Sequence, residues 1–264
     1  MASRTVVVTG GSSGIGEAVV AAFEAAGDAV IVVDRQEPSG AASFVHCDLS
    51  DTESIDAAAA QLPDRIDVLV NSAGVSGLAP ILTVMAVNFY GLRRLAEALA
   101  PSIVTGGSVV SVASTSGWYW REHLDEVSAV IAARTDEEIT DVIERFVPDG
   151  YTAYTRSKEA VVVWSTVASQ EHLGRVRFNS VSPGPIETPL LADFYEAMGH
   201  AELDPLTTRS GGRNGRPEEI ASVVRFLASP EAHWVNGTDV PVDHGAEMAE
   251  LLAGRGVISA LKNA

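Results

Sequence analysis

The chain has 264 residues, of which 46% are hydrophobic and 20% charged, and its 35 acidic and 18 basic residues give a formal net charge of -17. This length and composition fit a single soluble α/β domain that can bury a proper core. A surface this negative argues against nucleic acid and anionic membranes as partners, because both would be repelled.

The cysteine and histidine content and the start of the chain indicate the cellular compartment and bear on metal binding. Cys47 is the only cysteine, so no disulfide can form within the chain and a reducing compartment fits. Residues 1–4 lead directly into an apolar strand without a separate signal-peptide core, and no apolar run approaches the ~20 residues that span a bilayer. The six histidines lack metal-ligand spacing. We therefore expect a cytoplasmic protein without a metal site.

Short apolar runs alternate with helical patterns along the chain. Strands are predicted at 5–9, 29–33, 43–47, 66–70, 108–112, 176–181 and 239–242. Helices are predicted from a glycine-rich turn to about 26, over about 52–62, 84–99 and 217–228, and in a long segment around Tyr154. Val- and Ile-rich strands that are each followed by a helix predict a parallel sheet covered on both faces. This is the doubly wound Rossmann-type α/β architecture, and no linker or repeat divides it, so we expect one domain over 1–264.

Two helical patterns stand outside this alternation. Apolar residues recur at helical spacing over about 124–131 and again over about 139–146. Thr135 and Glu138 have the spacing of a capping box at the start of the second run. We therefore predict a helical insertion over residues 118–150, between a strand end and the next helix.

The first predicted strand leads into a glycine-rich turn, Thr9-Gly10-Gly11-Ser12-Ser13-Gly14-Ile15-Gly16, that opens a helix. Glycines at such a place allow a tight turn and close approach of the backbone to a pyrophosphate, which the helix N-terminus stabilises. The alternative is a plain structural turn, but the position after the first strand of an α/β chain favours a nucleotide. The expected cofactor contacts in this turn are Gly10, Ser12, Ser13, Gly14, Ile15 and Gly16.

Two carboxylates follow the next strands. Asp34 ends the second strand, where a carboxylate accepts hydrogen bonds from the adenosine ribose hydroxyls and repels a 2′-phosphate. Arg35 could bind that phosphate, but the carboxylate usually decides, so we expect NAD rather than NADP. Asp48, beside Leu49, is either an adenine contact or a helix cap, and Asp34 could likewise be a strand-end cap.

Tyr154 and Lys158 are four residues apart in a predicted helix, so their side chains lie on one face and can meet. An ammonium group near a phenol favours the phenolate, and one opposite charge typically lowers a pKa by ~1–3 units. A phenol with a lowered pKa can act as general base on an alcohol. The spacing alone is permissive, and a surface tyrosine and lysine on an ordinary helix is the alternative.

With these motifs in this order, the chain resembles the short-chain dehydrogenase/reductase superfamily over nearly its full length. The family's T-G-x-x-x-G-x-G turn spans Thr9 to Gly16, and its Y-x-x-x-K is Tyr154 to Lys158. The family's N-N-A-G appears as Asn71-Ser72-Ala73-Gly74, with serine in place of the second asparagine. The remaining matches are the helix asparagine Asn88, the strand-end serine Ser114, the strand asparagine Asn179 and the loop Pro183-Gly184-Pro185-Ile186-Glu187-Thr188.

The resemblance implies reversible hydride transfer between NAD and a secondary, benzylic or allylic alcohol, with Tyr154 as general base. Lys158 is then expected to lower the pKa of Tyr154 and to bond the nicotinamide ribose, and Ser114 to orient the substrate oxygen. Asn88 is expected to hold a water that links Lys158 to solvent. Ser114 could alternatively cap a turn, and Asn88 could satisfy backbone groups at a bend. The further cofactor contacts that the resemblance implies are Asn71, Ala73, Gly74, Pro183, Gly184, Ile186 and Thr188.

Two departures from the usual pattern of the family indicate which branch of it the chain resembles. Ser114 and Tyr154 are forty positions apart instead of the much shorter usual spacing, and the segment between Gly74 and Asn88 is short. Both features resemble the branch that contains bacterial 3α-hydroxysteroid dehydrogenase/carbonyl reductase and coniferyl alcohol dehydrogenase. The common D-G-G near the C-terminus appears here as Asp243-His244-Gly245.

Apolar residues near the proposed site indicate the substrate class. Trp118, Tyr119 and Trp120 come just after Ser114 and are expected at the mouth of the site. The residues expected in a mobile loop that forms the substrate lid are Leu190, Leu191, Phe194, Tyr195 and Met198. Both groups favour a flat apolar alcohol of the aryl, terpenoid or steroid type. The alternative is that the aromatic residues only seat the insertion against the domain.

The resemblance also implies an oligomeric state and leaves alternative functions to consider. The helices with Tyr154 and Asn88 form the subunit interface in the family, which implies a homodimer or homotetramer. A carbonyl or ketone reductase that works in the opposite direction, with NADP as a further alternative, has the same chemistry. A non-enzymatic regulator that binds NAD on this fold is also an alternative. The presence of Ser114, Tyr154 and Lys158 counts against it.

Overall fold

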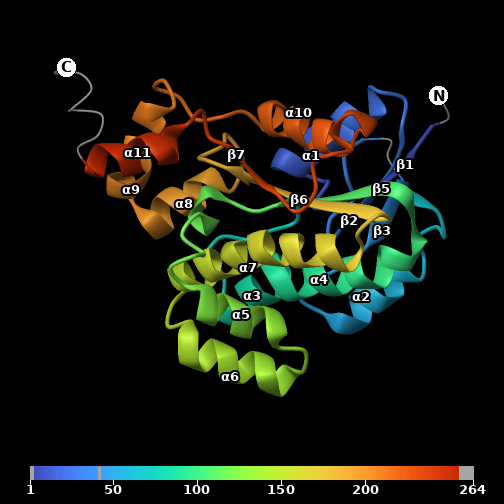
Figure 1. The fold of residues 1–264 in the computed structure, drawn as a ribbon, viewed down its shortest axis with the longest axis horizontal. Helices are drawn as coiled ribbons and strands as arrows, with labels where there is room; N and C mark the ends of the chain where they lie inside the picture. Colours follow the sequence, from blue (N-terminus) through green and yellow to red (C-terminus); the bar gives the residue numbers. More distant parts are fainter. Residues whose placement is uncertain (1–2, 41–42, 256–264) are drawn as a thin grey trace.

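The computed structural model describes residues 3–40 and 43–255. Seven parallel strands form one sheet in the order β3-β2-β1-β4-β5-β6-β7 (Figure 1). The strands are β1 (Thr5–Thr9), β2 (Ala29–Asp34), β3 (Ser43–His46), β4 (Ile66–Asn71), β5 (Ile103–Val112), β6 (Val176–Pro183) and β7 (Asp239–Val242). The helices are α1 (Gly14–Glu24), α2 (Thr52–Ala59), α3 (Ile81–Met85), α4 (Leu92–Leu99), α5 (Leu124–Ala132), α6 (Asp136–Phe146), α7 (Gly150–Glu171), α8 (Leu191–Met198), α9 (His200–Arg209), α10 (Pro217–Leu227) and α11 (Ala246–Gly254).

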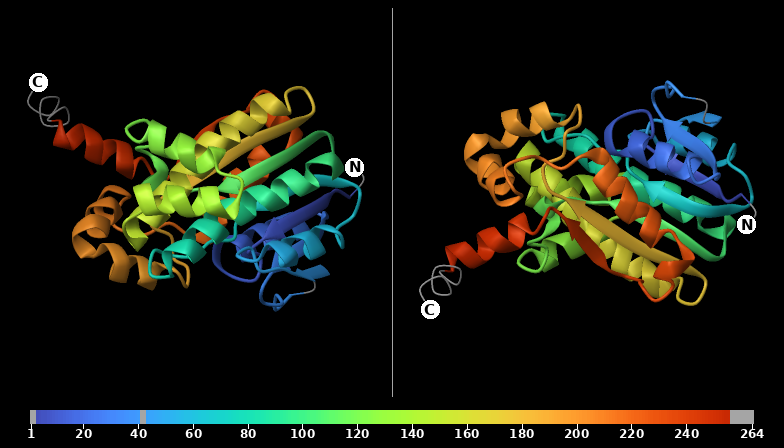
Figure 2. Two further views of the ribbon diagram at one scale, coloured as in Figure 1. Left: turned by 90° about the horizontal axis from the view of Figure 1, so that it is seen from below. Right: turned by 90° about the horizontal axis from the view of Figure 1, so that it is seen from above.

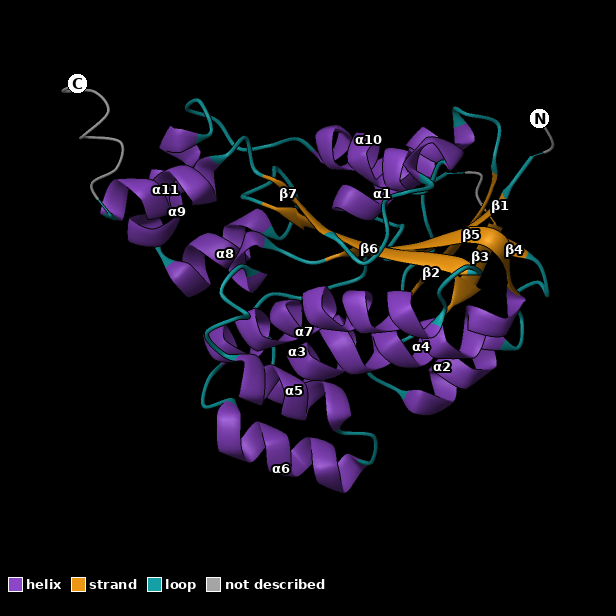
Figure 3. Cartoon of the chain, viewed as in Figure 1, coloured by secondary structure: helices purple, strands orange, loops and turns teal. Residues whose placement is uncertain are grey.

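The sheet has a hydrophobic core on each face because alternate residues of every strand point to opposite sides. Val6 and Val8 of β1 belong to the core that α1 and α10 cover. Val7 of β1 and Leu69 of β4 belong to the core under α2, α4 and α7. Figure 3 shows these helices on opposite sides of the strands. The predicted doubly wound Rossmann-type sheet is confirmed.

A row of polar residues crosses the otherwise apolar sheet. Thr9, Asn71, Ser111, Ser180 and Asp239 are register partners on five neighbouring strands, so their side chains share one face. Asn71 donates to the Ser111 hydroxyl at 3.1 Å, and the Ser180 hydroxyl donates to Asp239 at 2.6 Å. In β1, β4 and β5 the row lies near the carboxyl ends of the strands, where open α/β sheets bind ligands.

Helices α5 and α6 occupy most of the segment between β5 and α7. Helix α6 packs on α5, and α5 packs on α7 (Figures 1 and 2). The predicted capping box is present, because the Thr135 side chain accepts from the Glu138 amide and the Glu138 carboxylate accepts from the Thr135 amide. Its two reciprocal bonds fix where α6 begins.

Arg93 of α4 holds the end of α5 in place. It is 5% exposed and donates to the carbonyl oxygens of Ile131 and Ala133, both at 2.7 Å. The last carbonyls of a helix have no partner within the helix, so a buried guanidinium can satisfy them. This contact joins the segment before α7 to the main domain.

Several element boundaries differ from the prediction. Strand β5 begins at Ile103, and the helix predicted from 84 begins at Ile81 and includes a π-helical turn at Ala86–Gly91. The segment expected to be a loop lid forms helices α8 and α9, and α11 was not predicted. These short helices have few buried residues, so apolar periodicity did not reveal them.

Three findings concern the described residues alone. Cys47 is buried, and burial raises the pKa of its thiol to about 11. No helix within residues 3–40 and 43–255 is both long and apolar enough to span a bilayer. The same residues hold no cluster of three or more His, Cys, Asp or Glu side chains placed to bind a metal ion.

Candidate active site

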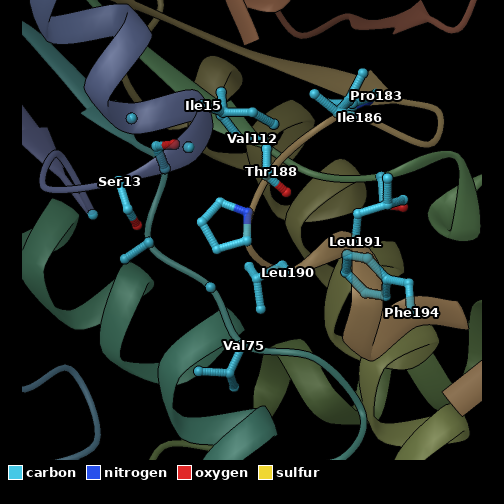
Figure 4. A pocket seen from close by; sticks show the side chains of 18 of the residues that line it. Ser13, Ile15, Val75, Val112, Pro183, Ile186, Thr188, Leu190, Leu191 and Phe194 are labelled. Carbon is cyan, nitrogen blue, oxygen red and sulfur yellow. The ribbon is translucent and has the colours of Figure 1, made fainter. Parts of the chain in front are cut away.

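The glycine-rich turn between β1 and α1 packs too closely for side chains. Gly10 has φ +67°, and a Cβ there would lie 2.6 Å from the Cα of Ala73. A Cβ on Gly16 would lie 2.0 Å from the carbonyl oxygen of Gly10. Ser13 and Ile15 lie at the edge of the pocket that the turn borders (Figure 4). The turn therefore brings bare backbone and the N-terminus of α1 to one wall of the pocket, as an anionic group would require.

Asp34 lies at the end of β2 and braces this turn. Its carboxylate accepts from the amides of Ser12 and Gln36, both at 3.1 Å. Asp34 therefore caps the strand end, the role considered as an alternative, and it also lines the pocket. Arg35 beside it is exposed and also lines the pocket.

Asp48 acts as a turn cap at the edge of the same pocket. Its carboxylate accepts from the Ser50 amide at 2.8 Å and from the Ser50 hydroxyl at 2.6 Å. Asp48 and Leu49 both line the pocket. The helix cap anticipated as an alternative for Asp48 is formed by Asp51 instead, whose side chain accepts from the Glu53 amide at the start of α2, and Asp48 stays beside the cavity.

The loop after β4 is pinned to β1. The Thr9 hydroxyl accepts from the amides of Ser72 and Ala73 at 3.1 and 3.2 Å, and Ala73 and Gly74 line the pocket. Asn71 was expected beside the cofactor but is not among the lining residues. It is fully buried and bonds Ser111 within the sheet, because it belongs to the strand rather than to the loop.

Ser114, Tyr154 and Lys158 line one pocket although they come from different elements. Lys158 Nζ donates to the Val112 carbonyl at 3.0 Å and lies 5.7 Å from the centroid of the Tyr154 ring. The Ser114 hydroxyl accepts from the Ser116 amide at 3.1 Å, which is the turn cap considered as an alternative. That bond uses only the acceptor side of the hydroxyl, so its proton is free to donate.

Burial dominates the charge properties of this trio. It raises the pKa of Tyr154 to about 12, against a smaller opposite effect of the Ser114 hydroxyl, and it lowers the pKa of Lys158 to about 8. The effect of Lys158 on the pKa of Tyr154 stays a prediction, because burial of the phenol dominates that pKa in the protein by itself. Removing both groups from water disfavours the phenolate and the ammonium form alike.

Asn88 is buried behind the pocket wall, in the π-helical turn. Its amide oxygen accepts from the Val75 amide at 2.8 Å, and its nitrogen donates to the Val75 carbonyl at 3.0 Å and to Ser157 at 3.3 Å. The backbone-satisfying role considered as an alternative is thus present. A Cβ on Gly74 would lie 3.4 Å from Asn88 Oδ1 and 3.6 Å from Lys158 Nζ. Gly74 therefore lies between the amide of Asn88 and the amine of Lys158, and only its backbone separates the two groups.

The opposite wall follows β6 and then α8. Pro183, Gly184, Ile186 and Thr188 line the pocket as expected, and Figure 4 shows three of them beside Leu190, Leu191 and Phe194. The apolar outer part is formed by Leu190, Leu191, Phe194, Met198, Leu203 and Leu206. The cavity measures about 300 Å³. It is large enough for a small-molecule ligand.

Some predicted lining residues lie elsewhere. Trp118, Tyr119 and Trp120 are not among the lining residues, and Tyr119 instead approaches Glu247 at 3.4 Å. Tyr195 of α8 packs on His200, with ring centroids 4.7 Å apart. The expectation that the three aromatic residues form the mouth is wrong, because the chain turns away from the cavity after Ser116.

Some groups of the pocket were not predicted from the sequence. The Val112 carbonyl, which accepts from Lys158, is a backbone group that no side-chain pattern reveals. Leu203 and Leu206 of α9 are three residues apart, a helical spacing that could have indicated a shared apolar face.

The fold and this pocket define a nucleotide-binding oxidoreductase of the Rossmann type. Residues 4–129 match the family model described as short chain dehydrogenase, and residues 139–247 match one described as Enoyl-(Acyl carrier protein) reductase. The chain belongs to the short-chain dehydrogenase/reductase family, whose members use a nicotinamide cofactor.

Individual relatives agree with this assignment. The chain is 38% identical to the coniferyl-alcohol dehydrogenase of Pseudomonas sp. strain HR199, over 93% of this chain and 97% of that protein. It is 29% identical to the 3-alpha-hydroxysteroid dehydrogenase/carbonyl reductase of Comamonas testosteroni, over 92% and 96%. The 3-alpha-hydroxysteroid dehydrogenase from Pseudomonas sp. B-0831, solved with NADH, has a TM-score of 0.80 and 30% identity and covers 92% of this chain and 98% of that one. The predicted resemblance to this branch is confirmed, and the chain is an oxidoreductase of the short-chain dehydrogenase/reductase type.

Proposed function

We propose that this protein is an NAD-dependent dehydrogenase that interconverts an apolar alcohol and its carbonyl compound. The observation that supports this most is the convergence of Ser114, Tyr154 and Lys158 on the pocket that the glycine-rich turn borders. Hydroxyl, phenol and ammonium groups in one nucleotide-sized pocket suit proton transfer to and from an alcohol.

The residues around the turn fit a dinucleotide. Gly10 and Gly16 leave room that a Cβ would fill, and Asp34 stands where the adenosine ribose is bound in such folds. The pyrophosphate would lie at the N-terminus of α1, and Gly184, Ile186 and Thr188 would line the nicotinamide end. Bound NAD supplies a hydride acceptor whose ring is positively charged. Asp34 favours NAD because its carboxylate repels a 2′-phosphate; Arg35 is the residue that would favour NADP.

Each catalytic side chain has a proposed task. The Tyr154 phenolate takes the hydroxyl proton of the alcohol, and the Ser114 proton is donated to the same substrate oxygen and orients it. Lys158 stabilises the phenolate and would bond the nicotinamide ribose. Asn88 would hold a water on the path from Lys158 to solvent. Because burial raises the pKa of Tyr154 to about 12, the base needs positive charge beside it to act near neutral pH.

The substrate class follows from the outer pocket. Six apolar side chains of α8, α9 and the residue before them line the same pocket as Tyr154, and charged side chains are absent from that described part of the wall. Such a lining suits a flat apolar alcohol of the aryl, terpenoid or steroid type. Coniferyl alcohol is one such aryl alcohol and gives its name to a relative.

We also propose that the protein forms a homo-oligomer, either a dimer or a tetramer. The resemblance supports this, because the helices with Tyr154 and Asn88 form the subunit interface in the family. Light scattering tests this, and a monomer at micromolar concentration would contradict it.

The test of function is NADH formation across a panel of aryl, terpene and steroid alcohols, with NADP as the control cofactor. Oxidation of an apolar alcohol with NAD is expected. The reverse assay, with the matching carbonyl compounds and NADH or NADPH, decides between a dehydrogenase and a reductase. If the protein binds NADH but converts no alcohol or carbonyl compound, the regulator hypothesis replaces the enzyme.

A further inference from the structure

A cluster of charged groups is buried on a part of α7 that does not line the pocket. Arg156 is 5% exposed and Glu159 is 0% exposed, and these residues alternate along the helix with Tyr154 and Lys158. Burying charge is costly unless each group is paired and hydrogen-bonded. The cluster therefore needs a reason beyond filling space.

The cluster joins α7 to the segment before it. Glu159 uses one carboxylate oxygen to pair with Arg156, and the other lies 2.7 Å from Nδ1 of His123. A second terminal nitrogen of Arg156 lies 2.5 Å from Glu126 of α5. The four residues thus connect two turns of α7 with the start of α5.

His123 stands at the end of the segment that begins with Ser114. A short 3₁₀ turn, Thr115–Gly117, follows Ser114 and packs on α7, where a Cβ on Gly117 would lie 3.0 Å from the Lys158 carbonyl. The segment therefore meets α7 at Lys158 through Gly117 and at the next residue, Glu159, through His123. These two contacts hold both ends of residues 117–123 against α7.

On the basis of the proposed function, we propose that Glu159 is a positioning residue that sets the place of the Ser114 hydroxyl relative to the Tyr154 phenol. Ser114 is held by β5 and Tyr154 by α7, and forty residues separate them in sequence. Glu159 holds the chain that follows Ser114 against α7 through His123, and Arg156 balances its charge and adds the contact with α5. A misplacement of about 1 Å at such a site can cost on the order of 100-fold in rate.

Hydrogen exchange tests the contact between Glu159 and His123, called the tether below, without any substrate. Glu159→Gln keeps the shape of the side chain, and His123→Ala removes the other partner at a half-exposed position, so at least one variant is expected to fold. Both should exchange the amides of residues 115–123 roughly tenfold faster than wild type, and the double variant no faster than either single variant. Asp141→Asn, which removes an exposed ion pair with Arg145 on α6, is the matched control and should change nothing there. Unchanged exchange at 115–123 in both variants would overturn the proposal.

Turnover tests the positioning role. With coniferyl alcohol and NAD, Glu159→Gln should lower kcat about tenfold while the KM for NAD stays the same. In a Ser114→Ala background the same substitution should have no further effect, because the group it positions is gone. An undiminished effect in that background would overturn the positioning role. A wild-type protein that oxidises no alcohol would instead refute the proposed function, and the exchange experiment would still decide on the tether.

Discussion

The ring of Phe194 in α8 lies against the ring of Tyr154 in α7, with centroids 5.0 Å apart and planes tilted by 59°. Phe194 thereby covers the phenol from the outer side of the pocket and leaves Tyr154 only 9% exposed. The proposed base is therefore screened from water by the same helix that provides the apolar substrate wall. Chemistry at Tyr154 and the substrate preference are expected to depend on each other through this contact.

Replacing Tyr154 by Phe should lower kcat by about 100- to 10,000-fold, because general acid–base catalysis typically contributes a factor of that size. NADH affinity, measured by fluorescence titration, should stay within about threefold of wild type. This limit corresponds to less than about 1.4 kcal/mol of binding free energy, the equivalent of a factor of ten. Tyr151→Phe changes an exposed tyrosine of the same helix and is the matched control. Wild-type turnover by Tyr154→Phe would remove the proposed base.

Replacing Asp34 by Asn should weaken NADH binding about tenfold and improve NADPH relative to NADH, since a bond to a charged acceptor contributes about 1.5–3 kcal/mol. Asn keeps a carbonyl oxygen that can still accept from the Ser12 amide. Isothermal titration with both cofactors measures the two affinities. Arg35→Ala should leave NADH binding unchanged. If the wild type instead preferred NADPH and Arg35→Ala lost that preference, NADP would be favoured as the natural cofactor.

Replacing Gly16 by Ala should destabilise the fold by about 1–3 kcal/mol, the usual effect of overpacking, and abolish cofactor binding. The new Cβ would meet the Gly10 carbonyl, which is backbone and cannot move aside. Gly254→Ala adds a methyl group at the end of α11 where nothing lies within 4 Å and should be tolerated. Urea denaturation and NADH titration of both variants provide the comparison. Equal stability of the two variants would contradict the packing argument.

Lys158 should make the protein more stable as the pH rises from about 8 to its ordinary pKa of 10.5. In this range the unfolded chain binds a proton that the folded protein has already lost, so unfolding becomes less favourable by up to about 3 kcal/mol. Below pH 8 both states are protonated and the contribution is constant. The free energy of unfolding of wild type minus that of Lys158→Met should therefore increase over this range. A difference that does not change with pH would contradict the burial of the ammonium group.

Replacing Arg93 by Ala should lower the free energy of unfolding by about 1–3 kcal/mol, the usual effect of leaving a buried acceptor without its partner. The carbonyls of Ile131 and Ala133 would lose their partner, and α5 should exchange its amide hydrogens faster. Arg94→Ala, which removes an exposed ion pair with Asp56 from the same helix, should have little effect. Thermal unfolding of both variants measures the difference, and equal shifts would refute the role of Arg93.

Much of the fold could be predicted because strands such as 5–9 and 29–33 are nearly continuous apolar runs that are typical of a sheet covered on both faces. Helices α5 and α6 were predictable from their spacing and from the Thr135 capping box. Helices α8 and α9 were not, because they cover a cavity rather than a core and present few buried residues to the pattern.

The candidate site was predictable where motifs fix the backbone, as at Gly10 and Gly16. It was not predictable where tertiary packing decides the outcome. Asn71 bonds within the sheet, Trp118 and its neighbours leave the cavity, and burial changes the pKa of Tyr154 in the direction opposite to that expected from Lys158 alone. Each of these depends on neighbours that are distant in sequence.

The buried thiol of Cys47 makes this chain convenient for site-specific labelling. It is the only cysteine, and its high pKa and lack of access keep it unreactive toward maleimides near neutral pH. A cysteine introduced on the exposed side of α6, for example at Glu144, would then be the single site for a fluorescent dye. Such a dye would report how α5 and α6 move against α7 during turnover without touching the pocket.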